Sequence, residues 1–190
     1  MKTIPTDIEG VVILEPDRYE DARGYFCESY SQERFDARVR PVRFVQDNES
    51  LSRRGVLRGL HFQRGACAQS KLVRVVAGRV LDVAVDIRIG SPTFGKHVAV
   101  ELSGENRRQL FIPRGFAHGF AVLSAEALFQ YKCDYPYAPE AEGGIAWDDP
   151  ALGIDWRLDP QEIILSERDR CRPTLAEASE LFDYNVDYYA

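Results

Sequence analysis

Hydrophobic and polar residues alternate in short runs through the middle of the chain. In residues 71–88, KLVRVVAGRVLDVAVDIR, two such runs meet near Gly78. Successive residues of a strand point to opposite faces of a sheet, so Asp82, Asp86 and Arg88 share one face of the second run. The opposite face is apolar and consists of Leu81, Val83, Val85 and Ile87. The pattern predicts two strands joined by a turn at Gly78.

Further segments carry similar strand signals: 97–102, 108–113, 116–123 and 127–133. Turn sequences such as SGEN and PRG separate them, and no helical period intervenes. Short strands at this spacing are typical of an antiparallel sandwich or barrel. The sequence therefore predicts a mainly β protein, a double-sheet jelly-roll barrel of antiparallel strands with a few short helices outside it.

Two segments near the ends of the chain carry helix-start signals. Ser31 is a capping-type residue at the start of SQERFDARV, and Thr174 and Glu177 have capping-box spacing. We expect short helices after Ser31 and from about residue 174. Because the chain has no repeat, low-complexity stretch or Pro/Ser-rich linker, residues 1–190 are expected to form a single domain.

The charge balance and the hydropathy of the chain narrow the classes of function. Lys and Arg number 24 against 30 Asp and Glu, a net charge of −6. This argues against broad binding of nucleic acid or an anionic membrane, because both need a basic face, although a local basic cluster could still hold a small anion. No apolar run approaches the roughly 20 residues that span a bilayer. Since MKTIPTDIEG also lacks the apolar region of a secretory signal, a cytoplasmic location is expected.

The sequence lacks the usual signatures of metal and nucleotide cofactors. The four cysteines (Cys27, Cys67, Cys133 and Cys171) are scattered without zinc spacing, and we expect reduced thiols. A metal-dependent jelly-roll enzyme needs several histidines and a carboxylate around one ion, whereas this chain has three histidines and no H-x-H pair. Neither G-x-G-x-x-G after a strand nor a P-loop motif occurs. We therefore expect no metal site and no cofactor.

The stretch GVLRGLHFQ, residues 55–63, places two polar side chains in an apolar strand. Arg58 and His61 are three positions apart, so a regular strand would point them to opposite faces. A bulge at Gly59 would shift the alternation and direct both side chains into one cavity. The alternative is that each polar group finds a separate local partner. If the strand lines a ligand cavity, we therefore expect irregular pairing at Gly59.

Other polar residues share strand faces with apolar ones. His118, Tyr131 and Lys71 each have a simple local interpretation: a core histidine bonded to a backbone carbonyl, a core-filling tyrosine, and a lysine that reaches solvent. Asp169, three residues after Ser166, fits a helix-capping carboxylate. Taken together, however, the inward histidines, tyrosine, lysine and arginine are groups that hold anions and transfer protons. Such groups suit proton abstraction next to a carbonyl.

Longer motifs reveal a resemblance to one family. They run in order along nearly the whole chain and include DARGYFCESY (21–30), FVQDNES (44–50), GVLRGLHFQ, ELSGENRRQLFIPRGFAHGF and ILSERD (164–169). In these motifs the sequence resembles the dTDP-4-dehydrorhamnose 3,5-epimerase family, whose members are cupin-type jelly rolls of deoxysugar-nucleotide metabolism.

The resemblance implies roles for individual residues. His61 would be the general base and Tyr131 the general acid on the opposite side of the sugar. Asp169 would orient His61, contrary to its local interpretation as a cap, and Lys71 would face the enolate oxygen. Residues implied to contact the nucleotide or sugar are Arg23, Glu28, Gln46, Asp47, Asn48, Arg58, His118, Tyr137, Glu142 and Arg168.

The resemblance also implies a reaction and a partner. The C4 ketone of dTDP-4-dehydro-6-deoxy-glucose acidifies the hydrogens at C3 and C5, so one base can remove each in turn without a cofactor. A homodimer is implied, with the N-terminal strands lying across the partner subunit. The nearest competing function is that of an epimerase that acts only at C3 of a related dTDP-4-keto-deoxysugar. A non-catalytic sugar-nucleotide binder on the same barrel and a metal-dependent cupin are two further candidates.

Two segments depart from the family pattern. RGACAQS (64–70) replaces a proline-rich loop, and Pro136 separates two tyrosines in DYPYAP. Neither departure touches the implied acid, base or lysine. They leave the details of the substrate open rather than the type of reaction.

Overall fold

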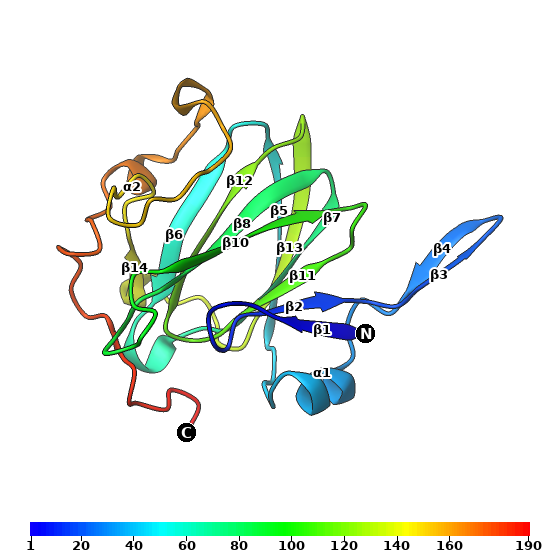
Figure 1. Ribbon diagram of the computed structural model, residues 1–190, viewed down its shortest axis with the longest axis horizontal. Helices are drawn as coiled ribbons and strands as arrows, with labels where there is room; N and C mark the ends of the chain where they lie inside the picture. Colours follow the sequence, from blue (N-terminus) through cyan, green and yellow to red (C-terminus); the bar gives the residue numbers. More distant parts are fainter.

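Two antiparallel sheets face each other in the computed structural model, which describes residues 1–190 (Figure 1). The six-stranded sheet has the order β1-β2-β11-β7-β13-β5, and the five-stranded sheet has the order β10-β8-β12-β6-β14. Neighbouring strands within both sheets pair antiparallel. The predicted mainly β, double-sheet jelly roll is confirmed.

The segments between residues 55 and 133 that were predicted as strands all form strands of these sheets, whereas the strands before residue 55 and after residue 133 were not among the predicted segments. The six-stranded sheet contains β1 (Lys2–Pro5), β2 (Val12–Glu15), β11 (Gln109–Ile112), β7 (Lys71–Ala77), β13 (Glu126–Cys133) and β5 (Gln46–Arg53). The five-stranded sheet contains β10 (His97–Ser103), β8 (Arg79–Asp86), β12 (Phe116–Val122), β6 (Leu57–Gln63) and β14 (Glu142–Gly144). Outside them lie an antiparallel hairpin, β3 (Arg18–Asp21) and β4 (Gly24–Cys27), and a parallel pair, β9 (Arg88–Ile89) and β15 (Phe182–Asp183).

Both faces of the five-stranded sheet are covered. One apolar cluster joins residues of the two sheets, such as Phe129 and Phe120, and fills the space between them. A second cluster packs the opposite face, including Leu81, against the segment after β14, which contributes Trp156. Because of this double cover, β8 is buried on both faces. Its acidic residue Asp82, on the face opposite Leu81, therefore points between the sheets and is fully buried.

The first predicted helix is confirmed. The helix α1 (Gln32–Arg38) begins after Ser31, whose side chain accepts a hydrogen bond from the backbone N–H of Arg34. The buried Phe35 belongs to an apolar cluster with Leu72 and Phe111, which come from strands of the six-stranded sheet. The helix is therefore fixed by packing beside the N-terminal strands.

The helix expected from about residue 174 does not form, and this part of the prediction was wrong. The side chain of Glu177 accepts a bond from the backbone N–H of Thr174, which is one half of a capping box, but the Thr174 hydroxyl donates to the same carboxylate and the chain makes only a turn. The backbone N–H of Leu175 donates to Asp149, and the Leu175 side chain is buried in the cluster behind the five-stranded sheet. These tertiary contacts outweigh the local capping signal. The helical turn nearby is α2 (Glu167–Arg170).

The β3–β4 hairpin projects from the body of the molecule (Figure 1). Its side chains are largely exposed, with Tyr19 64% and Phe26 69% accessible. No helix of the fold has the length and apolarity needed to cross a bilayer. All four cysteines are free thiols, as the sequence indicated.

Candidate active site

The strand β6 carries the irregularity that was predicted at Gly59. Opposite β12, His61 pairs with His118, but Arg58 pairs with Phe120, so the register shifts by one residue between them. Gly59 has a φ of +134°, and a Cβ built on it would lie 2.5 Å from the Cα of Gly119. Only glycine fits this conformation and this close approach. The shift brings Arg58 and His61 to the same cavity, and the prediction is confirmed.

Two adjoining cavities form what we call the cleft. The larger, of about 540 Å³, and its neighbour, of about 300 Å³, share residues from four strands. The shared residues are Asn48, His61, Lys71 and Tyr131. The larger cavity also reaches Arg58, His118 and Asp169, and the smaller reaches Gln46, Tyr137 and Glu142. Ten of the sequence-predicted site residues therefore line one cleft.

His61 and Asp169 form a hydrogen-bonded pair at one side of the cleft. The Nε2 atom of His61 lies 2.5 Å from Oδ1 of Asp169, whose side chain is almost fully buried. The hydroxyl of Ser166 donates to the other carboxylate oxygen at 2.9 Å and accepts from the Asp169 backbone N–H. Asp169 therefore has the position in the helical turn that its local pattern suggested, but the cap is the Ser166 side chain, and the Asp169 carboxylate binds the Ser166 hydroxyl and His61. With Nε2 held, the second ring nitrogen, Nδ1, is the one available to a substrate.

The carboxyl of Asp169 is held in its ionised form. Burial would raise its pKa, but the hydrogen bond and the charge of His61, with the bond from Ser166, lower the pKa below its ordinary value. An ionised carboxylate accepts a proton-bearing Nε2 and so fixes the tautomer in which Nδ1 can accept a proton.

A second histidine–carboxylate pair lies beside the first. The Nε2 atom of His118 is 3.0 Å from Oδ2 of Asp82, so the partner is a carboxylate and not the backbone carbonyl of the local interpretation. Burial lowers the pKa of His118 against the raising effect of Asp82, which keeps the imidazole neutral near pH 7. Asp82 was not predicted as a site residue from the sequence. Its signal was a carboxylate within an otherwise apolar strand.

Lys71 points into the cleft rather than to solvent, so its local interpretation was wrong. It is the first residue of β7 and is paired on one side with Ile112 and on the other with Cys133. Its ammonium group forms no ion pair within the chain. Burial lowers the pKa of Lys71, while the neighbouring Asp82 and Glu142 oppose this shift. An amine of this kind suits the stabilisation of a negative charge that appears in the cleft.

Tyr131 reaches the cleft from β13 with its ring among apolar side chains. Its strand face is shared by the buried Ala127, Phe129 and Cys133, as predicted. Burial raises the pKa of Tyr131, so its hydroxyl stays protonated over the ordinary pH range. The residue is therefore able to donate a proton.

Arg58 and Glu142 place groups of opposite charge at the two ends of the cleft. The guanidinium of Arg58 is bonded to the Ser52 hydroxyl at 3.1 and 3.2 Å and has no carboxylate partner. Glu142 accepts a hydrogen bond of 2.7 Å from the Tyr137 hydroxyl and pairs with Arg172. Burial would raise the pKa of Glu142, but these donors lower it, so the carboxylate is ionised. Arg58 is thus the guanidinium left free for an anion.

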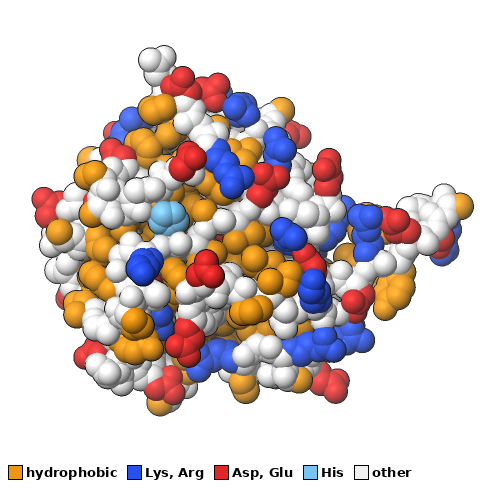
Figure 2. Space-filling model, in the orientation of Figure 1, with side chains coloured by type: hydrophobic (Ala, Val, Ile, Leu, Met, Phe, Trp, Pro, Cys, Tyr) orange, Lys and Arg blue, Asp and Glu red, His pale blue; other side chains and the backbone are white.

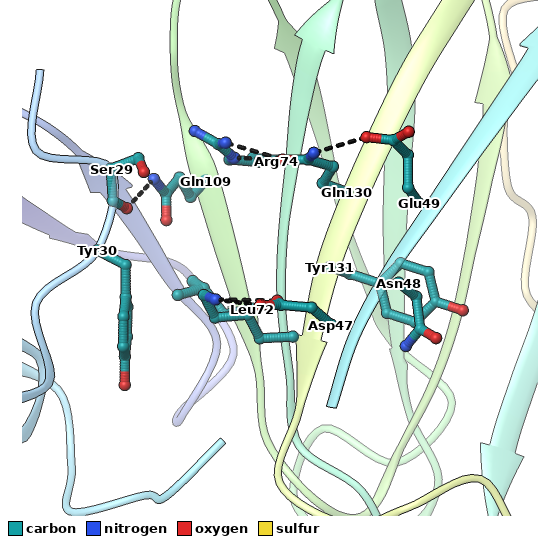
Figure 3. A pocket seen from close by; sticks show the side chains of 11 residues that line it. Ser29, Tyr30, Asp47, Asn48, Glu49, Leu72, Arg74, Gln109, Gln130 and Tyr131 are labelled. Carbon is teal, nitrogen blue, oxygen red and sulfur yellow. Dashed lines mark hydrogen bonds and ion pairs between the residues drawn. The ribbon is translucent and has the colours of Figure 1, made fainter. Parts of the chain in front are cut away.

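Four residues implied by the resemblance do not line the cleft of this chain. Successive residues of a strand point to opposite faces, so Asp47 and Asn48 lie on opposite faces of β5 (Figure 3). Asp47 pairs with Lys132 at 2.8 Å. Arg23 lies in the turn of the projecting hairpin, and Glu28 pairs with Arg34 at 3.3 Å. Arg168 is largely exposed and only approaches Glu142, at 3.8 Å.

Charges on the visible face of the molecule are mixed. Figure 2 shows acidic and basic side chains interspersed with apolar surface and no extended basic area on this face. The basic groups of the cleft, Arg58 and Lys71, are a local feature of a chain with a net charge of −6. No three His, Cys, Asp or Glu side chains gather in an arrangement suited to a metal ion.

The fold is a cupin-like jelly roll, and its cleft gathers histidine, tyrosine, lysine and carboxylate side chains. The family model described as dTDP-4-dehydrorhamnose 3,5-epimerase matches residues 5–177. The chain is 55% identical over 179 residues to the dTDP-4-dehydrorhamnose 3,5-epimerase of Salmonella typhimurium, covering 94% of this chain and 97% of that protein. It therefore belongs to the dTDP-4-dehydrorhamnose 3,5-epimerase family and is an isomerase.

Two other proteins define its place in the family. The crystal structure of the dTDP-6-deoxy-D-glucose-3,5-epimerase of Legionella pneumophila, in complex with dTDP-4-keto-L-rhamnose, superposes with a TM-score of 0.93 at 51% identity and covers 97% of this chain and 99% of that one. The dTDP-4-dehydrorhamnose 3-epimerase of Streptomyces niveus is 41% identical over 181 residues, covering 95% of this chain and 86% of that protein. By sequence identity, the chain is thus more similar to the 3,5-epimerases of Salmonella typhimurium and Legionella pneumophila than to the 3-epimerase of Streptomyces niveus.

Proposed function

We propose that this protein inverts C3 and C5 of dTDP-4-dehydro-6-deoxy-D-glucose to give dTDP-4-dehydro-L-rhamnose. The observation that carries the proposal is the His61–Asp169 pair, whose imidazole faces the same cleft as Lys71 and Tyr131. A base, a cation and a protonated phenol around one cavity are what epimerisation next to a ketone requires. The names and the bound ligand of the similar proteins support the same reaction.

In the proposed mechanism His61 is the base. Its Nδ1 atom takes the proton from C3, and the electrons of the broken C–H bond move to the C4 oxygen as an enolate. Asp169 stabilises the imidazolium that results. The ammonium of Lys71 stabilises the enolate oxygen, where charge appears only as the proton leaves. Tyr131 then donates a proton to the opposite face of the carbon, which restores the ketone with inverted configuration. The imidazolium of His61 then releases its proton to solvent and the Tyr131 phenolate takes one up from solvent, after which the same steps follow at C5.

The remaining cleft residues suit the binding of a sugar nucleotide. The free guanidinium of Arg58 can grip a diphosphate oxygen, and His118 presents a neutral imidazole beside Lys71. Gln46 and Asn48 supply amide groups, and Glu142 supplies a carboxylate. These groups can form hydrogen bonds with the sugar hydroxyls and with the nucleobase. The bond from the Tyr137 backbone N–H to the Gln46 side chain, at 2.9 Å, joins the aromatic residue to this wall.

We further propose that the protein acts as a homodimer in which each β3–β4 hairpin reaches the partner's cleft. The hairpin exposes Tyr19 and Phe26, large side chains that a globular chain rarely leaves free together. Arg23 lies in the turn of this arm and Glu28 directly follows its second strand, and neither lines the cleft of its own chain. Contact with the partner's substrate would give both residues the binding role that the resemblance implies.

Mixing two inactive variants tests this arrangement. In a mixture of Arg23→Ala and His61→Ala, half of the dimers would combine one copy of each, and one of their two clefts would be intact. We expect about a quarter of the wild-type activity to return after subunit exchange. No recovery, or a monomer in sedimentation velocity, would contradict the proposal.

We also propose that the protein acts in the cytoplasm, because its four free thiols fit a reducing compartment.

Deuterium incorporation tests the reaction itself. The protein is incubated with dTDP-4-dehydro-6-deoxy-D-glucose in heavy water, and C3 and C5 are followed by NMR, with His61→Ala as the control. Label at both carbons, lost in the variant, supports the 3,5-epimerase. Label at C3 alone supports the C3-only epimerase. Absence of label at both carbons would point to another substrate or to a binding protein.

A further inference from the structure

Three strands end side by side at Lys71. Lys71 of β7 pairs with Ile112 of β11 on one side and with Cys133 of β13 on the other. Ser70 and Asp134 adjoin this row and Arg114 lies two residues after Ile112, and none of the three has a part in the proposed mechanism. Contacts that hold these three strand ends in place therefore also hold the backbone of Lys71 in place.

Asp134 ties two of the strand ends together. Its Oδ1 atom accepts a hydrogen bond of 2.6 Å from the backbone N–H of Ser70, and its Oδ2 atom accepts one of 3.0 Å from Nε of Arg114. The side chains of Asp134 and Arg114 are 4% and 17% exposed. A charge-assisted pair in such a buried place is stronger and better defined than one on the surface.

Tyr189 completes the cluster from the other end of the sequence. Its hydroxyl lies 2.6 Å from the Ser70 hydroxyl and accepts a hydrogen bond of 3.0 Å from the backbone N–H of Arg114. Since Arg114 is the donor in that bond, the phenolic proton is free for Ser70. Burial raises the pKa of Tyr189, so the hydroxyl keeps this proton. Tyr189 therefore bonds to two of the three strand ends at once.

The ring of Tyr189 is held as firmly as its hydroxyl. The guanidinium of Arg40 lies 3.6 Å from the ring centroid, and the ring packs against the apolar cluster that includes Leu72 and Phe111. Arg114 also donates to the backbone carbonyl of Tyr188 at 2.6 Å. In Figure 1 this last segment runs down past the strands and ends beneath them. It lies outside residues 5–177, which the family model matches.

We propose that Tyr189 is a positioning residue for Lys71, acting through Ser70, Arg114 and Asp134. The inference rests on the proposed function, in which Lys71 stabilises the enolate. Lys71 has a flexible side chain and no ion pair, so the backbone at the start of β7 is the fixed point that decides where its ammonium group lies. A misplacement of about 1 Å at a catalytic group can cost about 100-fold in rate.

The substitution Tyr189→Phe removes only the hydroxyl and tests the inference. We expect kcat to fall about tenfold while KM stays within about twofold, because the ammonium acts on the enolate rather than on the bound substrate. In a Lys71→Ala background the same substitution should have no further effect on the slow C3 deuterium exchange, because the residue it positions is gone. The matched control is Tyr184→Phe, whose ring lies 5.1 Å from the Arg88 guanidinium and whose hydroxyl is unbonded; its activity should be unchanged.

A merely structural role would give a different pattern. Tyr189→Phe would then lower the thermal midpoint but leave kcat unchanged at temperatures well below it, or it would slow the wild-type and Lys71→Ala proteins equally. Either result overturns the inference. If Tyr189→Phe fails to fold, Ser70→Ala breaks the same bond and should give the same loss of kcat, and full activity would overturn the inference. A wild type without turnover would overturn the proposed function as well, whereas equal turnover by wild type and Tyr189→Phe would overturn the inference alone.

Discussion

The side chains of His61 and Asp169 meet at 2.5 Å although 108 residues separate them in the sequence. His61 lies on β6, and Asp169 lies in the single turn of α2. The Ser166 hydroxyl bonds to the second oxygen of the carboxylate and prevents its rotation. The imidazole is therefore oriented from its Nε2 side, and Nδ1 faces the cleft.

This arrangement predicts a large loss of activity for Asp169→Asn. The amide keeps the shape of the carboxylate, but it no longer selects the tautomer with a proton on Nε2. We expect kcat to fall about 1,000-fold or more with a small change in KM, as in other histidine–carboxylate pairs. Steady-state kinetics with dTDP-4-dehydro-6-deoxy-D-glucose measures both constants. The control is Glu167→Gln on the same turn, where the side chain is 96% exposed. A loss below tenfold would mean that Asp169 serves α2 rather than His61.

Tyr131→Phe should separate proton removal from inversion. His61 would still remove the substrate proton, but no acid on the opposite face would return one, so the carbon would be reprotonated from the side of the base. We expect deuterium to enter at C3 with retained configuration, while formation of the epimer falls about 100-fold or more. NMR in heavy water distinguishes the two products. Inversion at near the wild-type rate would exclude Tyr131 as the acid.

The decline of kcat at high pH, the alkaline limb of its pH profile, should result from deprotonation of Lys71. Burial lowers the pKa of Lys71 from the ordinary lysine value of about 10.5 and raises that of Tyr131 from about 10. The useful form of the lysine is the cation, which exists below its pKa and is lost as the pH rises. Activity should therefore decline at a pH below about 10.5. Lys71→Arg keeps its charge throughout and should remove this limb, even if its overall rate is lower. A limb that survives in Lys71→Arg would have to come from another group.

The order of strands along the chain could be predicted from sequence because its cause is local. Alternation of apolar and polar residues marks a strand, and the runs around Gly78 and Phe120 do form strands, although the double cover of the five-stranded sheet buries both faces of β8 and β12. The bulge at Gly59 was also predictable, because Arg58 and His61 are three positions apart and can face one cavity only if the strand is irregular between them. The expected helix at Thr174 failed because the competing partner of Leu175, Asp149, is distant in sequence.

The side-chain pairs of the cleft could not be predicted from local pattern. Asp169 has a complete local explanation as a cap, and only the fold shows that its other oxygen meets His61. Asp82 looked like one polar residue among apolar ones, because its partner lies on another strand. The resemblance supplied the role of Asp169, but it did not show that Asp47 turns away from the cleft. Such pairings depend on strand order and register, which one sequence does not fix.

The register shift at Gly59 should be sensitive to a single methyl group. A Cβ at this position would lie 2.5 Å from the Cα of Gly119 and 2.8 Å from the carbonyl oxygen of His118, and the φ of +134° is unfavourable for any residue with a side chain. We expect Gly59→Ala to lower the free energy of unfolding by about 3 kcal/mol, which corresponds to a thermal midpoint lower by about 6–12 °C.

Gly153→Ala is the matched control for this prediction. Gly153 has a φ of +57° and no atom within 4 Å of the added Cβ, so the change should cost about 1 kcal/mol of backbone strain without a clash. Gly59→Ala should also reduce kcat in the protein that remains folded, because relief of the clash moves His61 relative to Asp169. Differential scanning calorimetry gives the two thermal midpoints, and kinetics well below them gives kcat. Equal destabilisation by the two substitutions would mean that β6 and β12 can separate enough to admit a methyl group. The close glycine–glycine contact would then not be what sets the register of the catalytic strand.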